Sequence, residues 1–317
     1  FSIIIPVREI NDYIIESIPY FLNQSYKDFE IIILPDKTDR RIKNEKIRII
    51  KSGTIGPAEK RDLSIKYAKG EIFAFIDDDA YPDKDWLQNS LENFEDKNIA
   101  AIGGPNLTPE RDNKFQKASG FALSNSFVSG SVSYRYKKSK KRVIEDFPSC
   151  NLFVRKNIFK KIGGFDSSYW PGEDTKLCLE IIKTGKKIIY DPEVIVYHHR
   201  RKNLNSYLKQ IFSYSQHRGY FAKRFPETSL KIAYFVPSLF LIYLLLGPLF
   251  FLNKITFSIY SGILLFYLLL LFLVSLQGRI KGISFSRIVG IIFFTHIIYG
   301  MGFIIGIFKK NFKEEEK

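Results

Sequence analysis

Three runs of about 20 residues towards the C-terminal end contain no Asp, Glu, Lys or Arg: residues 232–252, 255–276 and 288–308. A helix of that length crosses the roughly 30 Å hydrocarbon core of a bilayer. A soluble fold would have to bury three such helices in succession, which needs a very large apolar shell around them. The pattern therefore predicts a membrane domain over residues 231–317.

Basic residues cluster just before the first run and between the second and third runs: Lys223, Arg224, Lys231, Arg279, Lys281 and Arg287. Because cytoplasmic loops are enriched in Lys and Arg, both clusters are predicted to face the cytoplasm. The domain before residue 231 then lies on the cytoplasmic face of a multi-pass protein of the cell membrane. The third run either spans, which places residues 309–313 outside against the same rule, or lies as a re-entrant or interfacial helix.

The net charge is +15 at pH 7, yet no zinc-finger, RNA-recognition or helix-turn-helix pattern accompanies it. The basic residues gather instead near the predicted membrane surface and in one loop, at 137–142, 200–202 and 218–224. Anionic headgroups attract such clusters by about 1 kcal/mol per basic residue. Membrane lipids, and not nucleic acid, are the predicted partners. Cys150 and Cys178 have no metal-binding spacing and fit a reducing compartment.

Apolar β-rich runs alternate with helical patterns through the first hundred residues. Strands are predicted at 2–5, 30–34, 47–50, 72–76 and 100–102, and helices at 11–22, 58–68 and 86–94. Such repeats predict an α/β domain with a mostly parallel sheet and helices on both faces. The segment 109–148 has weak periodicity and is predicted to be a long functional loop.

Three aspartates, Asp77, Asp78 and Asp79, follow the apolar strand predicted at 72–76. Ligands of open α/β sheets bind beyond the carboxyl ends of the strands. Alternate side chains of a strand share one side, so Asp77 and Asp79 face the same way and Asp78 turns away. Since Mg²⁺ takes one or two carboxylates together with substrate phosphates, the triplet predicts a cation site. A solvated acidic turn closed by Pro82 is the alternative.

Several short motifs resemble, in order and spacing, those of the family 2 glycosyltransferases, which have the Rossmann-like GT-A fold. They are IIIPV at 3–7, GPAEKRD at 56–62, FIDDD at 75–79, GGFD at 163–166 and GED at 172–174. The resemblance extends over nearly all of residues 1–225, within a predicted domain of residues 1–230. Helix 203–225 resembles the interfacial helix of membrane members that elongate lipid-linked sugars. The sequence departs from the family where Asp62 replaces a more usual Asn and Pro35 replaces an acid.

The resemblance implies a role for each matched position. Asp79 is the metal ligand for Mg²⁺ or Mn²⁺, with His198 favoured over His199 as a further ligand. Residues predicted to bind the UDP- or GDP-sugar donor are Pro6, Asp36, Arg61, Asp77, Asp78 and Arg218; Arg218 has acceptor diphosphate and lipid headgroups as alternative ligands.

Asp174 is predicted to be the general base that takes the proton of an acceptor hydroxyl. It opens the helical pattern 175–182, where the helix dipole keeps a carboxylate ionised. Favourable placement of charge at a helix start is the other explanation, and the upstream GGFD with Trp170-Pro171 favours catalysis.

These features together predict a membrane-bound, metal-dependent glycosyltransferase of the hexosyltransferase type. It would transfer a sugar from a nucleotide-sugar to a lipid-linked saccharide in polysaccharide biosynthesis. One carboxylate base without a second nucleophile indicates direct displacement and therefore inversion. The alternatives are a polyprenyl- or dolichyl-phosphate glycosyltransferase, a nucleotidyltransferase and a non-catalytic membrane scaffold.

Overall fold

The computed structural model describes residues 1–39, 41–166, 169 and 171–311. The chain forms two compact units. The first comprises residues 1–107 and 137–199 together with residue 311, and the second comprises residues 108–136 and 200–310. The predicted boundary at residue 230 differs from this division, because residues 108–136 and 200–230 pack with the C-terminal helices.

An eight-stranded sheet in the order β3-β2-β1-β4-β9-β6-β10-β8 forms the centre of the first unit. Its strands are β1 (Ser2–Pro6), β2 (Glu30–Leu34), β3 (Ile47–Ile49), β4 (Ile72–Ile76), β6 (Ile99–Gly103), β8 (Arg142–Ile144), β9 (Asn151–Arg155) and β10 (Lys187–Tyr190). Strands β3, β2, β1 and β4 are parallel, as are β6 and β10. Strand β9 runs antiparallel to both of its neighbours, and β8 is an antiparallel edge. The predicted mostly parallel sheet is confirmed.

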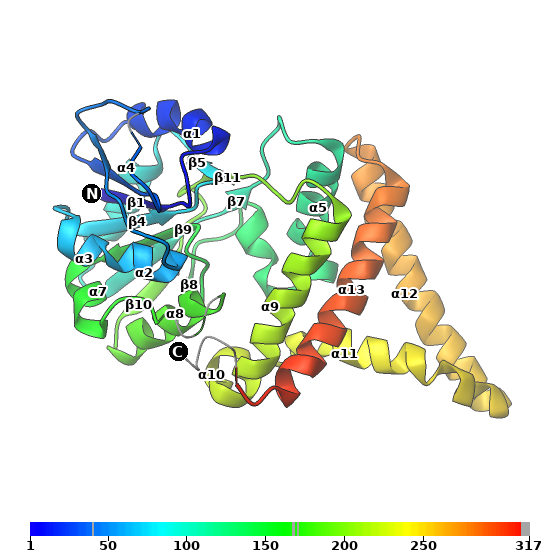
Figure 1. Ribbon diagram of the computed structural model, residues 1–317. Helices are drawn as coiled ribbons and strands as arrows, with labels where there is room; N and C mark the ends of the chain where they lie inside the picture. The colour runs from blue at the N-terminus through cyan, green and yellow to red at the C-terminus, as the bar shows by residue number, and fades with distance from the viewer. Residues whose placement is uncertain (40, 167–168, 170, 312–317) are drawn as a thin grey trace. The chain divides into compact units, whose positions relative to one another are not determined.

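Helices cover both faces of this sheet (Figure 1). On one face lie α1 (Asp12–Leu22) and α4 (Trp86–Asn93); on the other lie α2 (Pro57–Asp62), α3 (Ser64–Tyr67), α7 (Lys156–Ile162) and α8 (Glu173–Lys183). Side chains from β1, β2 and β4 pack against Ile14, Phe21 and Trp86, while Phe73 and Phe75 contact Phe159 across the opposite face. Burial on both faces explains why the strand sequences are uninterruptedly apolar.

A second sheet of three short strands has the order β5-β11-β7. Its strands are β5 (Ala80–Pro82), β11 (Val196–His198) and β7 (Asn106–Leu107). Strand β5 begins directly after the three aspartates, and its register pairs Ala80 with His198. This pairing brings the end of β11 beside the end of β4.

The second unit is helical. It contains α5 (Lys114–Ser124), α6 (Ser126–Ser129), the 3-10 helix η1 (Gly130–Tyr136), α9 (Leu204–Arg224), α10 (Pro226–Ser229), α11 (Ile232–Leu245), η3 (Gly247–Leu252), α12 (Lys254–Ile280) and α13 (Phe285–Phe308). The prediction of a long loop over 109–148 was wrong, because α5, α6, η1 and β8 lie within it. The start of α5 carries a sequence signal for a helix: Asn113 and Gln116 form a reciprocal capping box.

Two of these helices, α12 with 27 residues and α13 with 24, are long and apolar enough to cross a membrane. The first predicted run does not form one helix of that length, since α11 has 14 residues and the chain continues as the 3-10 helix η3. Gly247 and Pro248 start η3, and proline cannot donate the hydrogen bond that an α-helix would need there.

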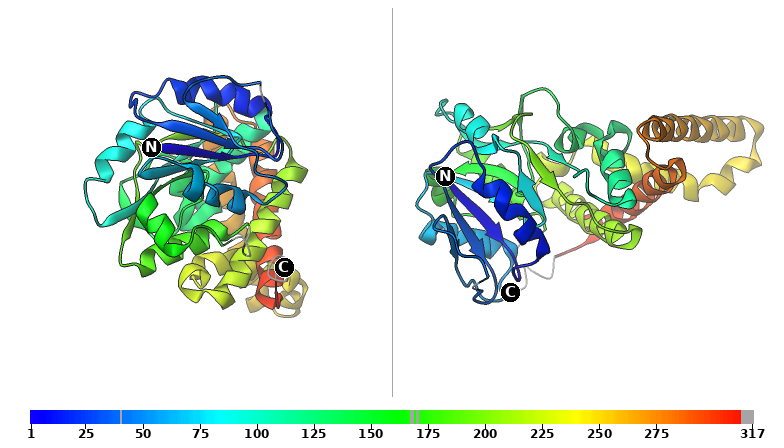
Figure 2. Two further views of the ribbon diagram at one scale, coloured as in Figure 1. Left: turned by 60° about the vertical axis from the view of Figure 1, so that its left-hand side comes forward. Right: turned by 90° about the horizontal axis from the view of Figure 1, so that it is seen from above.

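Glycines let α9 and α13 approach closely (Figures 1 and 2). A Cβ atom on Gly219 of α9 would lie 2.1 Å from the carbonyl oxygen of Phe303, and one on Gly306 of α13 would lie 2.0 Å from that of Gln216. Neither position has room for a side chain. Backbone-to-backbone contact of this kind is common where apolar helices pack in membranes. The predicted interfacial helix is therefore bound along its length to a candidate membrane span.

Candidate active site

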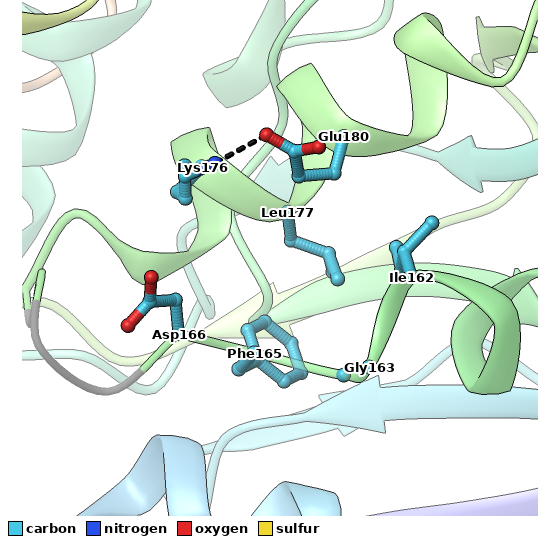
Figure 3. A pocket seen from close by; sticks show the side chains of 8 residues that line it. Ile162, Gly163, Phe165, Asp166, Lys176, Leu177 and Glu180 are labelled. Carbon is cyan, nitrogen blue, oxygen red and sulfur yellow. Dashed lines mark hydrogen bonds and ion pairs between the residues drawn. The ribbon is translucent and has the colours of Figure 1, made fainter.

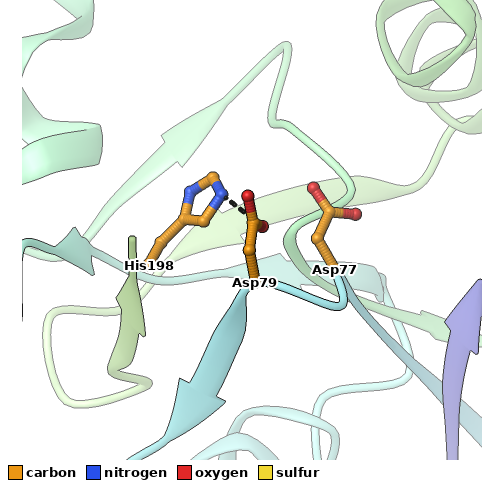
Figure 4. A group of neighbouring side chains, drawn as sticks. All are labelled: Asp77, Asp79 and His198. Carbon is orange, nitrogen blue, oxygen red and sulfur yellow. Dashed lines mark hydrogen bonds and ion pairs between the residues drawn. The ribbon is translucent and has the colours of Figure 1, made fainter. Parts of the chain in front are cut away.

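Asp77 and Asp79 lie with His198 at the carboxyl end of β4 (Figure 4). Each of the three residues offers one ligand atom, and these atoms lie within 4.8 Å of one another. The His198 Nε2 atom is 2.9 Å from Asp79 Oδ1. The backbone fixes this arrangement, because the His199 N–H donates to the carbonyl oxygen of Asp79 at 3.0 Å. Two carboxylates and an imidazole are a suitable ligand set for Mg²⁺ or Mn²⁺.

His198 has an unusual electrostatic environment for a histidine. Burial lowers its pKa, but the charge of Asp79 and the adjacent Cys150 outweigh burial and raise the pKa to about 10. The protonated ring is then the counter-ion of Asp79. Since a metal binds only the neutral imidazole, a cation at this site would have to displace that proton.

Asp78 turns away from the other two aspartates, as strand alternation predicts. Its Oδ2 atom accepts a hydrogen bond from Asn11 Nδ2 at 2.5 Å, at the residue that caps α1. Burial and the charge of Asp79 raise the pKa of Asp78 to about 6. Its printed contact is therefore with the residue that caps α1, and its donor-binding role stays a prediction.

Arg61 connects the cluster of Asp77, Asp79 and His198 to the start of α8. Its Nη2 atom is 2.7 Å from Asp77 Oδ1, and its Nη1 atom is 3.2 Å from Glu173 Oε1. Both Arg61 and Glu173 are buried. Burial and the charge of Asp174 raise the pKa of Glu173, while Arg61 opposes that rise. This buried pair holds two chain segments together that are more than 100 residues apart in sequence.

Asp174, the predicted base, is the second residue of α8 and is partly exposed. Its charge acts on Arg61, so it belongs to the same electrostatic group as Asp77 and Glu173. The GGFD turn before it is held by Asp62, whose Oδ1 atom accepts the Phe165 N–H at 2.8 Å. Trp170 lies outside the described residues.

Pro6 and Asp36 lie where β1 and β2 end, and a cation that the sequence did not reveal contacts Asp36 and Val7, the residue after Pro6. The buried Lys60 ammonium pairs with Asp36 and donates to the Val7 carbonyl oxygen at 2.5 Å. The Asp36 N–H in turn donates to the Arg8 carbonyl oxygen at 2.9 Å. These two predicted donor-binding residues are therefore brought together at one edge of the sheet.

A hollow of about 460 Å³ lies beside the GGFD turn (Figure 3). Phe165, Asp166 and Lys176 are among the residues that line it, and Lys176 pairs with Glu180 across one turn of α8. Asp77, Asp79 and His198 are not among its lining residues. The hollow and the cluster of Asp77, Asp79 and His198 are therefore separate features of the first unit.

Arg218 belongs to the second unit. It lies on α9, its Nη1 atom is 3.3 Å from Ser229 Oγ, and its guanidinium stacks over Tyr234 at 5.2 Å. Sequence reasoning also missed Asn11, Lys60 and Cys150, which reach the site only through the fold. Of these, Asn11 had a signal, since it is a capping residue before a helical pattern.

A helix-covered, mostly parallel sheet with acids at its strand ends is typical of nucleotide-binding α/β enzymes. The family model of glycosyl transferase family 2 matches residues 2–163, and the chain belongs to that family. The protein is accordingly a glycosyltransferase that uses a nucleotide sugar, and the resemblance seen in the sequence is confirmed.

Relatives extend this similarity beyond the matched region. Dolichyl N-acetyl-alpha-D-glucosaminyl phosphate 3-beta-D-2,3-diacetamido-2,3-dideoxy-beta-D-glucuronosyltransferase of Methanococcus voltae is 25% identical over 331 residues, which cover 98% of each chain. An uncharacterized glycosyltransferase of Rickettsia typhi is 28% identical over 247 residues, covering 72% of this chain and 73% of that protein. A mannosyltransferase of Pyrobaculum calidifontis, solved with GDP-Man and Mn²⁺, superposes with a TM-score of 0.50 at 17% identity, covering 69% of this chain and 61% of that one. This last likeness shows the GT-A fold.

Proposed function

We propose that this glycosyltransferase is membrane-bound and transfers a sugar, with inversion, from a UDP- or GDP-sugar to a hydroxyl group of a lipid-linked saccharide at the cytoplasmic face. The observation that carries the proposal is the cluster of Asp77, Asp79 and His198, which Arg61 joins to the start of α8. Helices α12 and α13 support membrane attachment. The name of the Methanococcus voltae relative includes a dolichyl-linked sugar phosphate, which supports the acceptor class.

The donor end of the reaction is assigned to the strand ends of β1, β2 and β4. Pro6 and Asp36 contact the nucleotide, with Lys60 holding the Asp36 carboxylate in place. Asp79 and His198 would hold Mg²⁺ or Mn²⁺, with Asp77 beside them as a further candidate ligand. When bound, the cation supplies positive charge against the charge that develops on the departing nucleoside diphosphate.

The acceptor end is assigned to Asp174, which takes the proton of the attacking hydroxyl group. Glu173 is poorly suited to this role because it is buried and paired with Arg61. Arg61 instead keeps Asp77 and α8 at a fixed separation, so that donor and base stay aligned. A single base without a second carboxylate nucleophile leads to inversion at the transferred carbon.

Calorimetry with a panel of UDP- and GDP-sugars, with and without Mn²⁺, tests the donor site. The intact protein in detergent is expected to bind at least one donor only when Mn²⁺ is present. Asp79→Ala should abolish this metal-dependent binding, whereas Asp85→Ala, an exposed aspartate six residues further on, should leave it unchanged. Tight metal-dependent binding by Asp79→Ala would refute the assignment.

Asp174→Asn tests the class of acceptor. A hydroxyl acceptor needs a base, so the variant is expected to lose about 10²–10⁴-fold in turnover while still binding the donor. A phosphate acceptor is already an anion and needs no base. Near-normal turnover of the variant would therefore indicate that the acceptor is a polyprenyl phosphate and not a hydroxyl group.

A further inference from the structure

Helices α9 and α13 lie side by side and run in the same direction within the second unit (Figure 1). The hydroxyl group of Tyr207, in the first turn of α9, is 2.9 Å from Thr295 Oγ1, near the middle of α13. At the far end of both helices, the Lys223 ammonium donates to the carbonyl oxygen of Lys309. The glycine contacts described above lie between these two points. The second half of α13 therefore has α9 beside it along its whole length.

This pairing limits how α13 can be placed in a membrane. A helix of 24 residues is about 36 Å long, so it crosses a hydrocarbon core of about 30 Å only when it stands nearly upright, with Thr295 near the midplane. Helix α9 would then enter the hydrocarbon too, and exposed Lys209, about 3 Å along the axis from Tyr207, would lie near the centre. Exposed Lys202 would follow, because α9 begins only three residues before Tyr207. A lysine at the bilayer centre costs about 2.5–3.5 kcal/mol in membrane insertion.

The basic clusters at the helix ends give a second, independent argument. Residues 223–231 precede α11 and residues 279–287 precede most of α13, and both clusters are predicted to face the cytoplasm. The start of α13 belongs to the second cluster, because it contains Arg287. Its end lies with the first cluster, because Lys309 contacts Lys223. Both ends of α13 are therefore expected on one side of the membrane, which is impossible for a helix that spans it.

The exposed surfaces of the two helices differ in chemistry. Exposed apolar side chains of α13 recur at intervals of seven, four and three residues and so form one stripe along the helix. This apolar stripe consists of Phe294, Met301, Ile305 and Phe308. On α9, Lys209 and Lys223 are exposed, and their spacing of two heptads places them on one face. The second unit carries 18 lysines and arginines against three acids, a net charge of +15. Apolar and basic surfaces on adjoining helices are typical of an element that lies in the membrane interface.

We propose that α9 and α13 lie together in the interface of the cytoplasmic leaflet, with the apolar stripe towards the acyl chains and Lys209 and Lys223 among the lipid headgroups. Helix α13 then does not cross the bilayer. The two crossings are α12 and the segment of α11 and η3, whose 14 α-helical and 6 3-10 residues rise about 33 Å. Only the name of the leaflet rests on the proposed function, because the arguments above hold for either orientation.

Labelling of single cysteines tests whether α13 crosses. The variants Lys254→Cys, Lys281→Cys and Lys310→Cys place an exposed thiol at the start of α12, after α12 and after α13. Each is treated with a membrane-impermeant maleimide in intact cells and in opened cells. Lys310→Cys is expected to follow Lys281→Cys, and following Lys254→Cys instead would overturn the proposal. If Lys281→Cys reacts in intact cells, the proposed cytoplasmic orientation fails, yet Lys310→Cys should still follow it.

Fluorescence quenching measures the depth of α13. A thiol-reactive fluorophore is attached to Phe294→Cys or to Leu268→Cys, an exposed position near the middle of α12. In vesicles of phosphatidylcholine and phosphatidylglycerol, a nitroxide on the headgroup should quench the label at residue 294 more strongly than one near the end of the acyl chain. The reason is that interfacial helices lie only about 5–10 Å into the boundary between headgroups and chains. The label at residue 268 should show the reverse order, and deep quenching at both positions would refute the proposal.

Lys209→Cys tests whether α9 lies at the membrane surface. Its thiol should react with the impermeant maleimide once the cells are opened, without detergent, whereas Leu268→Cys should react only after detergent is added. A Lys209→Cys thiol that also needs detergent would contradict the proposal. Mn²⁺-dependent donor binding is measured on the same variants, so that a failure of the proposed donor site is seen separately from a failure of this arrangement.

Discussion

Two adjacent histidines at the end of β11 differ in what they contact. His198 pairs with Asp79 at 2.9 Å, whereas His199 packs on the Tyr13 ring at 4.8 Å and lies 3.4 Å from a Glu16 carboxylate oxygen. Strand alternation predicts that only one of them can face Asp77 and Asp79, and His198 lies on that side.

The two histidines therefore provide a matched pair of variants. His198→Ala is expected to weaken Mn²⁺ binding by roughly tenfold or more, and His199→Ala is expected to leave it within about twofold. Isothermal titration with Mn²⁺ in the absence of donor measures both. Equal losses in the two variants would contradict the assignment of His198 as a ligand.

Asp62 gives a prediction for the pH dependence of stability. Burial raises its pKa from 3.8 to about 7, although the Phe165 N–H and Arg61 act in the opposite direction. Because the folded pKa is above the unfolded value, the stability from this group is complete below pH 4 and is lost as pH rises through 7. The loss is at most about 4 kcal/mol, at about 1.4 kcal/mol per pKa unit.

Asp62→Asn removes the titration while keeping an oxygen for the Phe165 N–H. Its Tm at pH 8 should exceed that of the unsubstituted protein, and the difference should shrink or reverse at pH 4. Thermal unfolding in detergent at both pH values measures this. A Tm difference that is the same at the two pH values would contradict the raised pKa.

At the scale of elements, the sequence predicted those strands and side-chain groups whose signal lies in neighbouring residues. Strands β1, β2 and β4 were found because each is an apolar run with a polar end. Asp77 and Asp79, which lie together with His198, were singled out because their motif is contiguous, and the role of Asp174 stays a prediction. Strand β9 was missed, since its place between β4 and β6 depends on pairing with strands about 50 to 80 residues away. The Lys60–Asp36 and Arg61–Glu173 pairs were missed for the same reason.

The contact between α9 and α13 is testable with two glycines of the same helix. Gly306→Ala would place a methyl group 2.0 Å from the Gln216 carbonyl oxygen, while Gly290 has nothing within 4 Å of its added Cβ. Overpacking is expected to cost about 1–3 kcal/mol and lower Tm. Gly290→Ala should be neutral or slightly stabilising, because Ala favours the helix over Gly. Thermal unfolding in detergent measures the Tm of both variants, and equal Tm values would argue against close packing of α9 and α13.

At the scale of the whole molecule, charge and hydrophobicity are segregated in the same way. The first unit is close to neutral, whereas the second combines a net charge of +15 with the candidate spans. Attraction to anionic lipid then acts mainly on the second unit, and it should decline with salt because exposed charges are screened.

The proposed topology can be read from chemical labelling. Lys254 and Lys281 lie at opposite ends of α12, so they should be on opposite sides of the membrane. In intact cells, a membrane-impermeant maleimide is expected to label Lys254→Cys and to label Lys281→Cys only after the cells are opened. Cys150 and Cys178 are buried and give little background. Labelling of Lys281→Cys in intact cells would reverse the proposed orientation.

The glycine contacts between α9 and α13 also bear on how the chain is made. Helix α9 ends at residue 224 and α13 begins at residue 285, so about 60 residues are translated between them. At about 5–20 residues per second, roughly 3–12 s pass between the synthesis of the end of α9 and the start of α13. The face of α9 that carries Gly219 is without α13 throughout that interval. The contacts that fix α9 against α13 can therefore form only late in synthesis, after the segments α10 to α12 have been made.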